Sequence, residues 1–236
     1  MHEPLLLLPG MMCDARLFTH QIARLSQDRC VVIGPVTQGE TVTEMARFIL
    51  QAAPPRFALA GHGLGGMVAM EILRLAPEQV TRLALIDTSP LAELPTVAAD
   101  REPLIMAAKL GRLEQALEDE MKPDYLAPQG NRERVLAQYR RMGMDLGPEV
   151  FIRQTRAMQR RPDQQKTLRM AKLPAFAICG EYDALCPVHR HEVMAGLMPH
   201  GQIRTIAQAG HLAPLEQPVA LTAALGEWLK APLVLH

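Results

Sequence analysis

The stretch GHGLGG at residues 61–66 decides the fold. The apolar run FALA (57–60) leads into it and predicts a buried strand, and MVAMEIL (67–73) leads out with the apolar spacing of a helix. The glycines that flank the centre let strand and helix approach closely around a sharp turn. A turn of this kind presents its central residue in a strained conformation that a β-carbon disfavours. That residue is Gly63, which relieves the strain but supplies no reactive group.

The rest of the chain alternates apolar runs of strand length with helical patterns. Near-continuous apolar strands separated by helices indicate a parallel sheet covered on both faces. We therefore predict an α/β fold, a doubly wound and mostly parallel sheet of about six strands. The predicted strands are Leu5–Leu8, Cys30–Ile33, Phe57–Ala60, Leu83–Ile86, Ala175–Cys179 and Gln202–Ile206.

The segment from about Ser89 to Leu168 does not follow this alternation of strands and helices. It has no strand-like run and shows helical patterns around residues 103–121, 132–142 and 150–160, separated by prolines and glycines. Two short motifs follow it. Gly180-Glu181-Tyr182-Asp183 comes directly after a predicted strand, and Gly210-His211-Leu212 comes after the last one.

The turn, the acidic motif and the histidine motif, in this chain order, resemble the α/β-hydrolase family. The resemblance extends from Leu5 to Trp228. It implies a core of residues 1–88 and 169–236 and an inserted helical cap of residues 89–168. Relatives carry a nucleophilic serine at the centre of the turn, where this chain has Gly63.

The same resemblance implies roles for the site residues. His211 is the expected general base, since an imidazole titrates near working pH. Asp183 is the expected carboxylate that orients it, with Glu181 and Asp87 as competitors. The backbone amides of Met11 and Leu64 are the expected oxyanion donors.

Other residues near these motifs receive expected roles as well. His62 is expected to be structural, packed beside the turn, and His191 is expected on a helix surface. Cys13 lies near the expected oxyanion loop and is kept as an alternative nucleophile. Methionines are flexible and polarisable, so several are expected to line an adaptable apolar substrate pocket: Met12, Met67, Met106 and Met142.

Composition narrows the functional classes. The 25 basic and 25 acidic residues give a formal net charge of zero, which argues against nucleic acid or an anionic membrane as partner. The four cysteines form no Cys-x-x-Cys pair, as expected for free thiols in a reducing, cytoplasmic setting. We expect no metal or organic cofactor, and either a monomer or a homodimer.

Gly63 leaves three interpretations open. The chain is a serine hydrolase whose nucleophile has been replaced, or a ligand-binding pseudoenzyme, or a synthase or lyase in which His211 acts without a covalent step. The resemblance favours the first, with a small, largely apolar carboxylic ester or lactone as the substrate of the active form.

Overall fold

The computed structural model describes residues 2–233 and confirms the predicted sheet. Six parallel strands lie in the order β2-β1-β3-β4-β5-β6. Their bounds are β1 Leu5–Leu8, β2 Val31–Ile33, β3 Phe57–His62, β4 Val80–Ile86, β5 Ala175–Gly180 and β6 Gly201–Ile206. The chain passes from β1 outward to β2 at one edge. It then returns to β3 on the other side of β1 and continues through β4 and β5 to β6 at the opposite edge, so the sheet is doubly wound.

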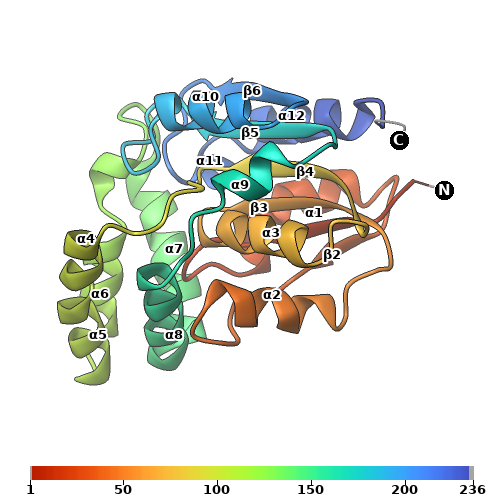
Figure 1. Cartoon of the computed structure of the whole chain (residues 1–236). Helices are drawn as coiled ribbons and strands as arrows, with labels where there is room; N and C mark the ends of the chain where they lie inside the picture. Colours follow the sequence, from red (N-terminus) through yellow and green to blue (C-terminus); the bar gives the residue numbers. More distant parts are fainter. Residues whose placement is uncertain (1, 234–236) are drawn as a thin grey trace.

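Alternate residues of the inner strands enter two separate cores. Leu5 and Leu7 of β1 point into one core and Leu6 and Leu8 into the other, as the two-residue period of a strand requires. One face is covered by α1 (Thr19–Leu25) and α12 (Pro218–Lys230). The other is covered by α2 (Val42–Leu50), α3 (Leu64–Leu75), α9 (Gln165–Arg169) and α10 (Val188–Leu197) (Figure 1).

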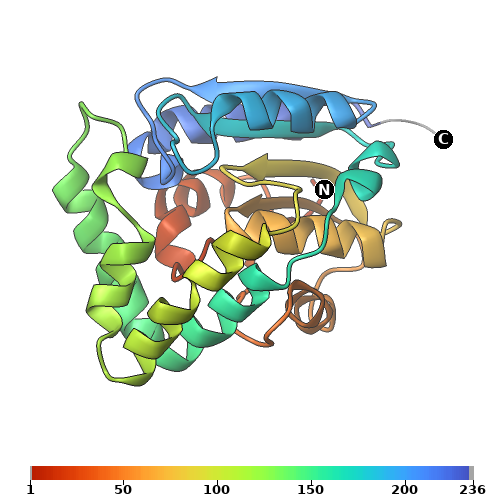
Figure 2. The same ribbon diagram turned by 60° about the vertical axis from the view of Figure 1, so that its left-hand side comes forward.

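The helical segment between β4 and β5 lies beyond the carboxyl ends of the strands (Figures 1 and 2). Its helices are α4 Pro95–Asp100, α5 Glu102–Lys109, α6 Leu113–Glu120, the 3-10 turn η2 Pro123–Tyr125, α7 Arg132–Leu146 and α8 Pro148–Gln159. The helical insert spans residues 95–169, and we call its part from α4 to α8 the cap, since α9 packs on the sheet. Whether its limits are those of a separate domain, at 89 and 168, stays a prediction.

Strand register brings the loops of the site together. Leu8 pairs with Gly61, His62 with Ile86, and Gly180 with Ile206, so these strands end at the same edge of the sheet. The loops after β1, β3, β5 and β6 therefore face the cap, where ligands bind in open α/β sheets.

Two short elements complete the chain, η1 (Ala15–Phe18) and α11 (Ala213–Glu216). Asp14 caps η1 by accepting a hydrogen bond from the Arg16 amide, and Thr41 caps α2 by accepting one from the Glu44 amide. Within residues 2–233, no helix has the length and apolar character that crossing a membrane requires.

Candidate active site

The turn at Gly63 has the backbone geometry expected of it. Gly63 has φ 52° and ψ −118°, a region that residues with a β-carbon rarely adopt. Its amide donates to the Ile86 carbonyl at 2.9 Å, and its own carbonyl accepts from Thr88 Oγ1 at 2.7 Å. A β-carbon on Gly65 would overlap the Leu8 carbonyl. The close approach of the helix backbone to the end of β1 therefore requires glycine at residue 65.

Space for a side chain exists at residue 63. A β-carbon placed there lies 3.8 Å from His211 Nε2 and 3.7 Å from the Gly10 α-carbon, both ordinary van der Waals distances. A hydroxyl one bond further would come within hydrogen-bond reach of the imidazole. The site is thus shaped to accept a small polar side chain that the chain does not have.

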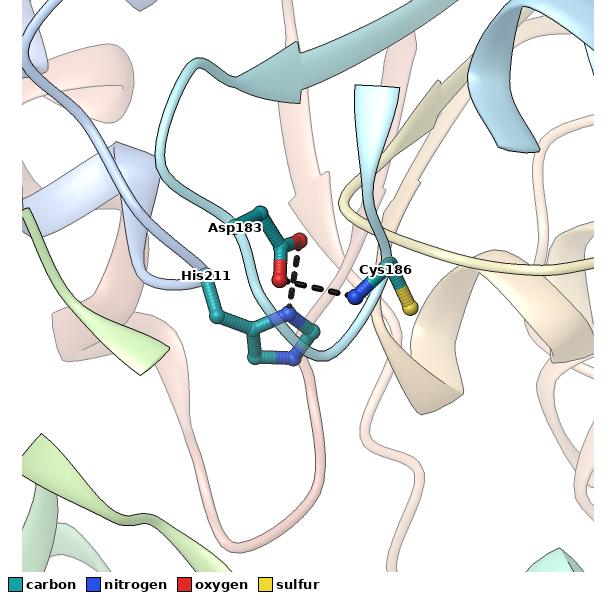
Figure 3. A group of neighbouring side chains, drawn as sticks. All are labelled: Asp183, Cys186 and His211. Carbon is teal, nitrogen blue, oxygen red and sulfur yellow. Dashed lines mark hydrogen bonds and ion pairs between the residues drawn. The ribbon is translucent and has the colours of Figure 1, made fainter. Parts of the chain in front are cut away.

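His211 and Asp183 form a buried pair beside Gly63. His211 Nδ1 donates to Asp183 Oδ2 at 2.9 Å, which leaves Nε2 as the acceptor that faces residue 63. The other carboxylate oxygen accepts from the Leu185 amide at 2.9 Å and from the Cys186 amide at 2.8 Å, of which Figure 3 shows the second. The two competitors have other hydrogen-bond partners: Asp87 Oδ1 accepts from the Gly180 amide, and Glu181 from the Gln208 amide.

The electrostatics of the pair favour a proton on the imidazole. Burial opposes charge on His211, but the Asp183 carboxylate outweighs it and raises the histidine pKa above its ordinary value. Burial likewise opposes charge on Asp183, yet His211 and the Cys186 amide lower its pKa overall. A base of this kind takes up a proton readily and holds the cation once formed.

Two further side chains hold the loops of the site in place. Glu216 accepts from the amides of Gly210, Leu212 and Ala127 and so fixes the loop that carries His211. Gln154 of α8 accepts from the Met12 amide and donates to the Val36 carbonyl, both at 2.8 Å. The Met12 amide is thereby occupied, while Met11 lines the cavity next to Gly63 and Leu64 begins α3. The first amides of a helix have no intrahelical partner, so Leu64 can offer its N–H to a ligand.

A second histidine lies 5.2 Å from His211, measured between ring centroids. His62 is fully buried, and its Nε2 donates to the His211 carbonyl at 2.7 Å. This agrees with the structural role expected for it. His191 is also fully buried, where it accepts from the Thr88 amide, so the prediction that it lies on a helix surface is wrong.

The site opens into a cavity of about 530 Å³ between the sheet edge and the cap. Among the methionines expected to line it, Met67 does so. Met12 and Met142 lie fully buried in the core and Met106 is half exposed, and none of these three lines the cavity. Met121 and Met158 do line it, although the sequence pattern did not separate them from the other cap methionines.

The thiols near the site are poorly suited to attack. Cys13 is buried, does not line the cavity, and has its pKa raised by burial and by Asp14. Cys186 lines the cavity, and its sulfur lies within 4.8 Å of polar atoms of Asp183 and His211 (Figure 3). Burial and the nearby carboxylates raise its pKa well above the ordinary value, so the thiol stays protonated. His211 Nδ1 and both oxygens of Asp183 are engaged in hydrogen bonds, and we assign no metal to this cluster.

Comparisons with known proteins identify the family and agree with the fold. The sequence profile of the "Alpha/beta hydrolase family" matches residues 5–225. The chain belongs to this family. Its fold resembles that of a thermophilic esterase from Thermogutta terrifontis with a TM-score of 0.87, at 25% identity over 98% of this chain and 90% of the esterase.

Curated relatives of this α/β-hydrolase have a similar level of sequence identity. The biotin biosynthesis bifunctional protein BioHC of Teredinibacter turnerae is 26% identical over 81% of this chain, which spans only 36% of that protein's length. The pimeloyl-[acyl-carrier protein] methyl ester esterase of Hamiltonella defensa is 25% identical, over 73% of this chain and 68% of the esterase.

Proposed function

We propose that this α/β-hydrolase carries the binding site and the acid–base pair of a carboxylic-ester or lactone hydrolase and lacks only the covalent nucleophile. The observation that carries the proposal is the 3.8 Å separation between a β-carbon built on Gly63 and His211 Nε2. The esterase activity named for the Thermogutta and Hamiltonella proteins supports the same substrate class.

In the form with serine at residue 63, the reaction follows from the geometry. His211 Nε2 takes the hydroxyl proton while the oxygen attacks the carbonyl carbon, and Asp183 stabilises the imidazolium. The amides of Met11 and Leu64 are the proposed donors to the oxyanion. His211 then gives its proton to the leaving alcohol, and an acyl-enzyme remains. The same nitrogen takes a proton from a water molecule, which attacks the acyl carbon and releases the acid.

The chain with Gly63 retains a slower route. His211 is in place to take a proton from a water molecule, which attacks a carbonyl held by the same amides without a covalent intermediate. The intact His211–Asp183 pair favours this reading over a ligand-binding protein with no chemistry. Sites without their nucleophile keep a rate advantage over solution of roughly a thousandfold.

Hydrolysis of a panel of p-nitrophenyl esters and lactones by the chain with Gly63, by Gly63→Ser and by Gly63→Ala tests the proposal. We expect Gly63→Ser alone to gain activity, by about a millionfold in kcat. The alanine variant introduces the same backbone strain without the hydroxyl and controls for it. A folded Gly63→Ser protein that hydrolyses nothing in the panel contradicts the proposal.

A further inference from the structure

The cavity has a second polar region, in the cap, that the reaction above does not use. Tyr139 of α7 lines the cavity, and its side chain is 1% exposed. Among the residues that the structure describes, its hydroxyl has no hydrogen-bond partner. Leaving a buried hydroxyl unpaired destabilises a folded protein, which makes such a group a candidate for pairing with a ligand.

The same cavity is lined by charged side chains whose charges balance. Arg101 binds Glu93 at 2.5 Å and Glu120 at 3.1 Å, and Arg161 binds Glu93 at 2.5 Å. All four side chains line the cavity and are no more than 12% exposed. Two guanidinium groups against two carboxylates give this wall no net charge, so it offers no strong attraction to an anion.

The Tyr139 hydroxyl remains a donor under all ordinary conditions. Burial and the Glu120 carboxylate raise the pKa of Tyr139 well above its ordinary value. The O–H group therefore stays protonated and remains a hydrogen-bond donor, on a side chain that lines the same cavity as Gly63 and His211. Apolar side chains, including Met121 and Leu94, line the same cavity.

We propose that the Tyr139 hydroxyl is a specificity-determining group that binds an uncharged hydrogen-bond acceptor, such as a keto or amide oxygen, on the part of the substrate that lies under the cap. This inference rests on the proposed function and deepens it: the substrate is an ester or lactone that carries a second, neutral polar group. An entirely apolar substrate leaves the hydroxyl unpaired, and a carboxylate meets the balanced ion pairs of Glu93, Arg101, Glu120 and Arg161.

Binding of three methyl esters of the same shape tests the inference in the chain with Gly63, where the ester persists. Methyl 5-oxohexanoate carries a neutral acceptor, methyl 5-methylhexanoate replaces it by a methyl group, and monomethyl glutarate replaces it by a carboxylate. Homologues one carbon shorter and longer sample the depth of the cavity. We expect the keto ester of at least one length to bind about 3- to 10-fold more tightly than both of its partners, the gain typical of one neutral hydrogen bond.

Tyr139→Phe removes the hydroxyl and keeps the ring. It should abolish the preference for the keto ester and leave binding of the methyl-branched ester within twofold, and Tyr182→Phe, outside the cavity, should change neither. The melting temperature of the ligand-free Tyr139→Phe protein should stay the same or rise, because no internal hydrogen bond is lost. A fall in melting temperature, equal binding of keto and methyl-branched esters at every length, preference for the carboxylate, or no saturable binding of any probe overturns the inference.

Kinetics separate this inference from the proposed function. If Gly63→Ser hydrolyses the esters but Tyr139→Phe slows keto and methyl-branched esters alike, the inference fails and the function stands. If Gly63→Ser hydrolyses none of them while the binding preference for the keto ester is present and depends on Tyr139, the function fails and the subsite stands.

Discussion

Two buried histidine–aspartate pairs lie next to each other at the edge of the sheet, and they differ in chemistry. His211 and Asp183 share a 2.9 Å hydrogen bond, whereas His62 Nε2 and Asp87 Oδ2 are 3.6 Å apart. His62 Nε2 instead donates a hydrogen bond to the His211 carbonyl, and Asp87 accepts one from the Gly180 amide.

The pKa shifts of the two pairs run in opposite directions. The pKa of His211 is raised and that of Asp183 lowered, so this pair supports a charged imidazolium. Burial lowers the pKa of His62 to about 3, and burial together with the Asp183 charge raises that of Asp87 well above its ordinary value. The same residue types at the same depth thus give one pair suited to proton transfer and one structural pair in which burial favours the neutral forms.

The largest expected effect distinguishes the two histidines. In the Gly63→Ser background, His211→Ala should lower kcat for an activated ester by about 10⁵- to 10⁶-fold, because the base is lost. His62→Asn should lower it by no more than about 100-fold, the cost of a small displacement of the His211 loop. Steady-state kinetics measure both; similar losses in the two variants would remove the distinction between the pairs.

The two aspartates should differ in the same way. Asp183→Asn leaves the imidazole in the wrong tautomer and should lower kcat by about 10⁴-fold in the Gly63→Ser background. Asp87→Asn replaces a carboxyl whose pKa is raised with an uncharged amide of the same shape and should cost tenfold or less. If Asp87→Asn is the more damaging change, Asp87 and not Asp183 serves the base, and our assignment of the acid is wrong.

The pH dependence of kcat/KM sharpens the comparison further. The base acts in its neutral form, so activity of Gly63→Ser should be lost as the pH falls through the pKa of His211 in the free enzyme, tenfold for each pH unit. Because Asp183 raises that pKa, the midpoint should lie above the ordinary histidine value of about 6.5. A pH–rate profile with its midpoint well below 6.5 would be the signature of an imidazole without a carboxylate partner.

The smallest effect concerns stability in acid. Burial lowers the pKa of His62 to about 3 and that of His191 to about 4, so below about pH 6.5 the unfolded chain binds protons that the folded chain does not. Each histidine should lower the free energy of unfolding by up to about 1.4 kcal/mol for each pH unit between pH 6.5 and its folded pKa. His211 acts in the opposite sense. Its raised pKa in the folded protein stabilises the fold below pH 6.5, and this contribution is lost as the pH rises through the pKa of His211 in the folded protein.

Urea unfolding of the parent and of His191→Gln at several pH values measures the difference. Between pH 6.5 and 4, the free energy of unfolding of the variant should fall less steeply than that of the parent. The difference in slope should be the contribution of one histidine, up to about 1.4 kcal/mol for each pH unit. The same slope in both proteins would show that His191 is not held neutral by burial.

The sequence predicts the sheet and the turn well because both depend on local pattern. The apolar runs mark the strands, and the glycines around Gly63 mark the turn that the chain forms there. The proximity of Asp183 and His211 also follows, since both come directly after neighbouring strands that end at one edge of the sheet.

Contacts that depend on how the cap docks were not predictable in this way. Gln154 reaches the Met12 amide across 142 residues of sequence, and nothing in its helix marks it as different from other polar residues. For the same reason the sequence did not tell which methionines face the cavity: Met142 lies on the same helix as Tyr139, yet it packs in the core. Helical spacing shows that a face is buried but not what it is buried against.

Covalent labelling with a fluorophosphonate, read by mass spectrometry of the peptide that carries residue 63, tests the central claim most directly. This reagent phosphonylates an activated serine and needs no knowledge of the substrate. The account predicts that Gly63→Ser acquires one adduct at residue 63, that labelling is lost when His211→Ala is added, and that the chain with Gly63 and Gly63→Ala acquire none. A folded Gly63→Ser protein that stays unlabelled, or an adduct on the chain with Gly63, would contradict the claim that the site is complete except for its nucleophile.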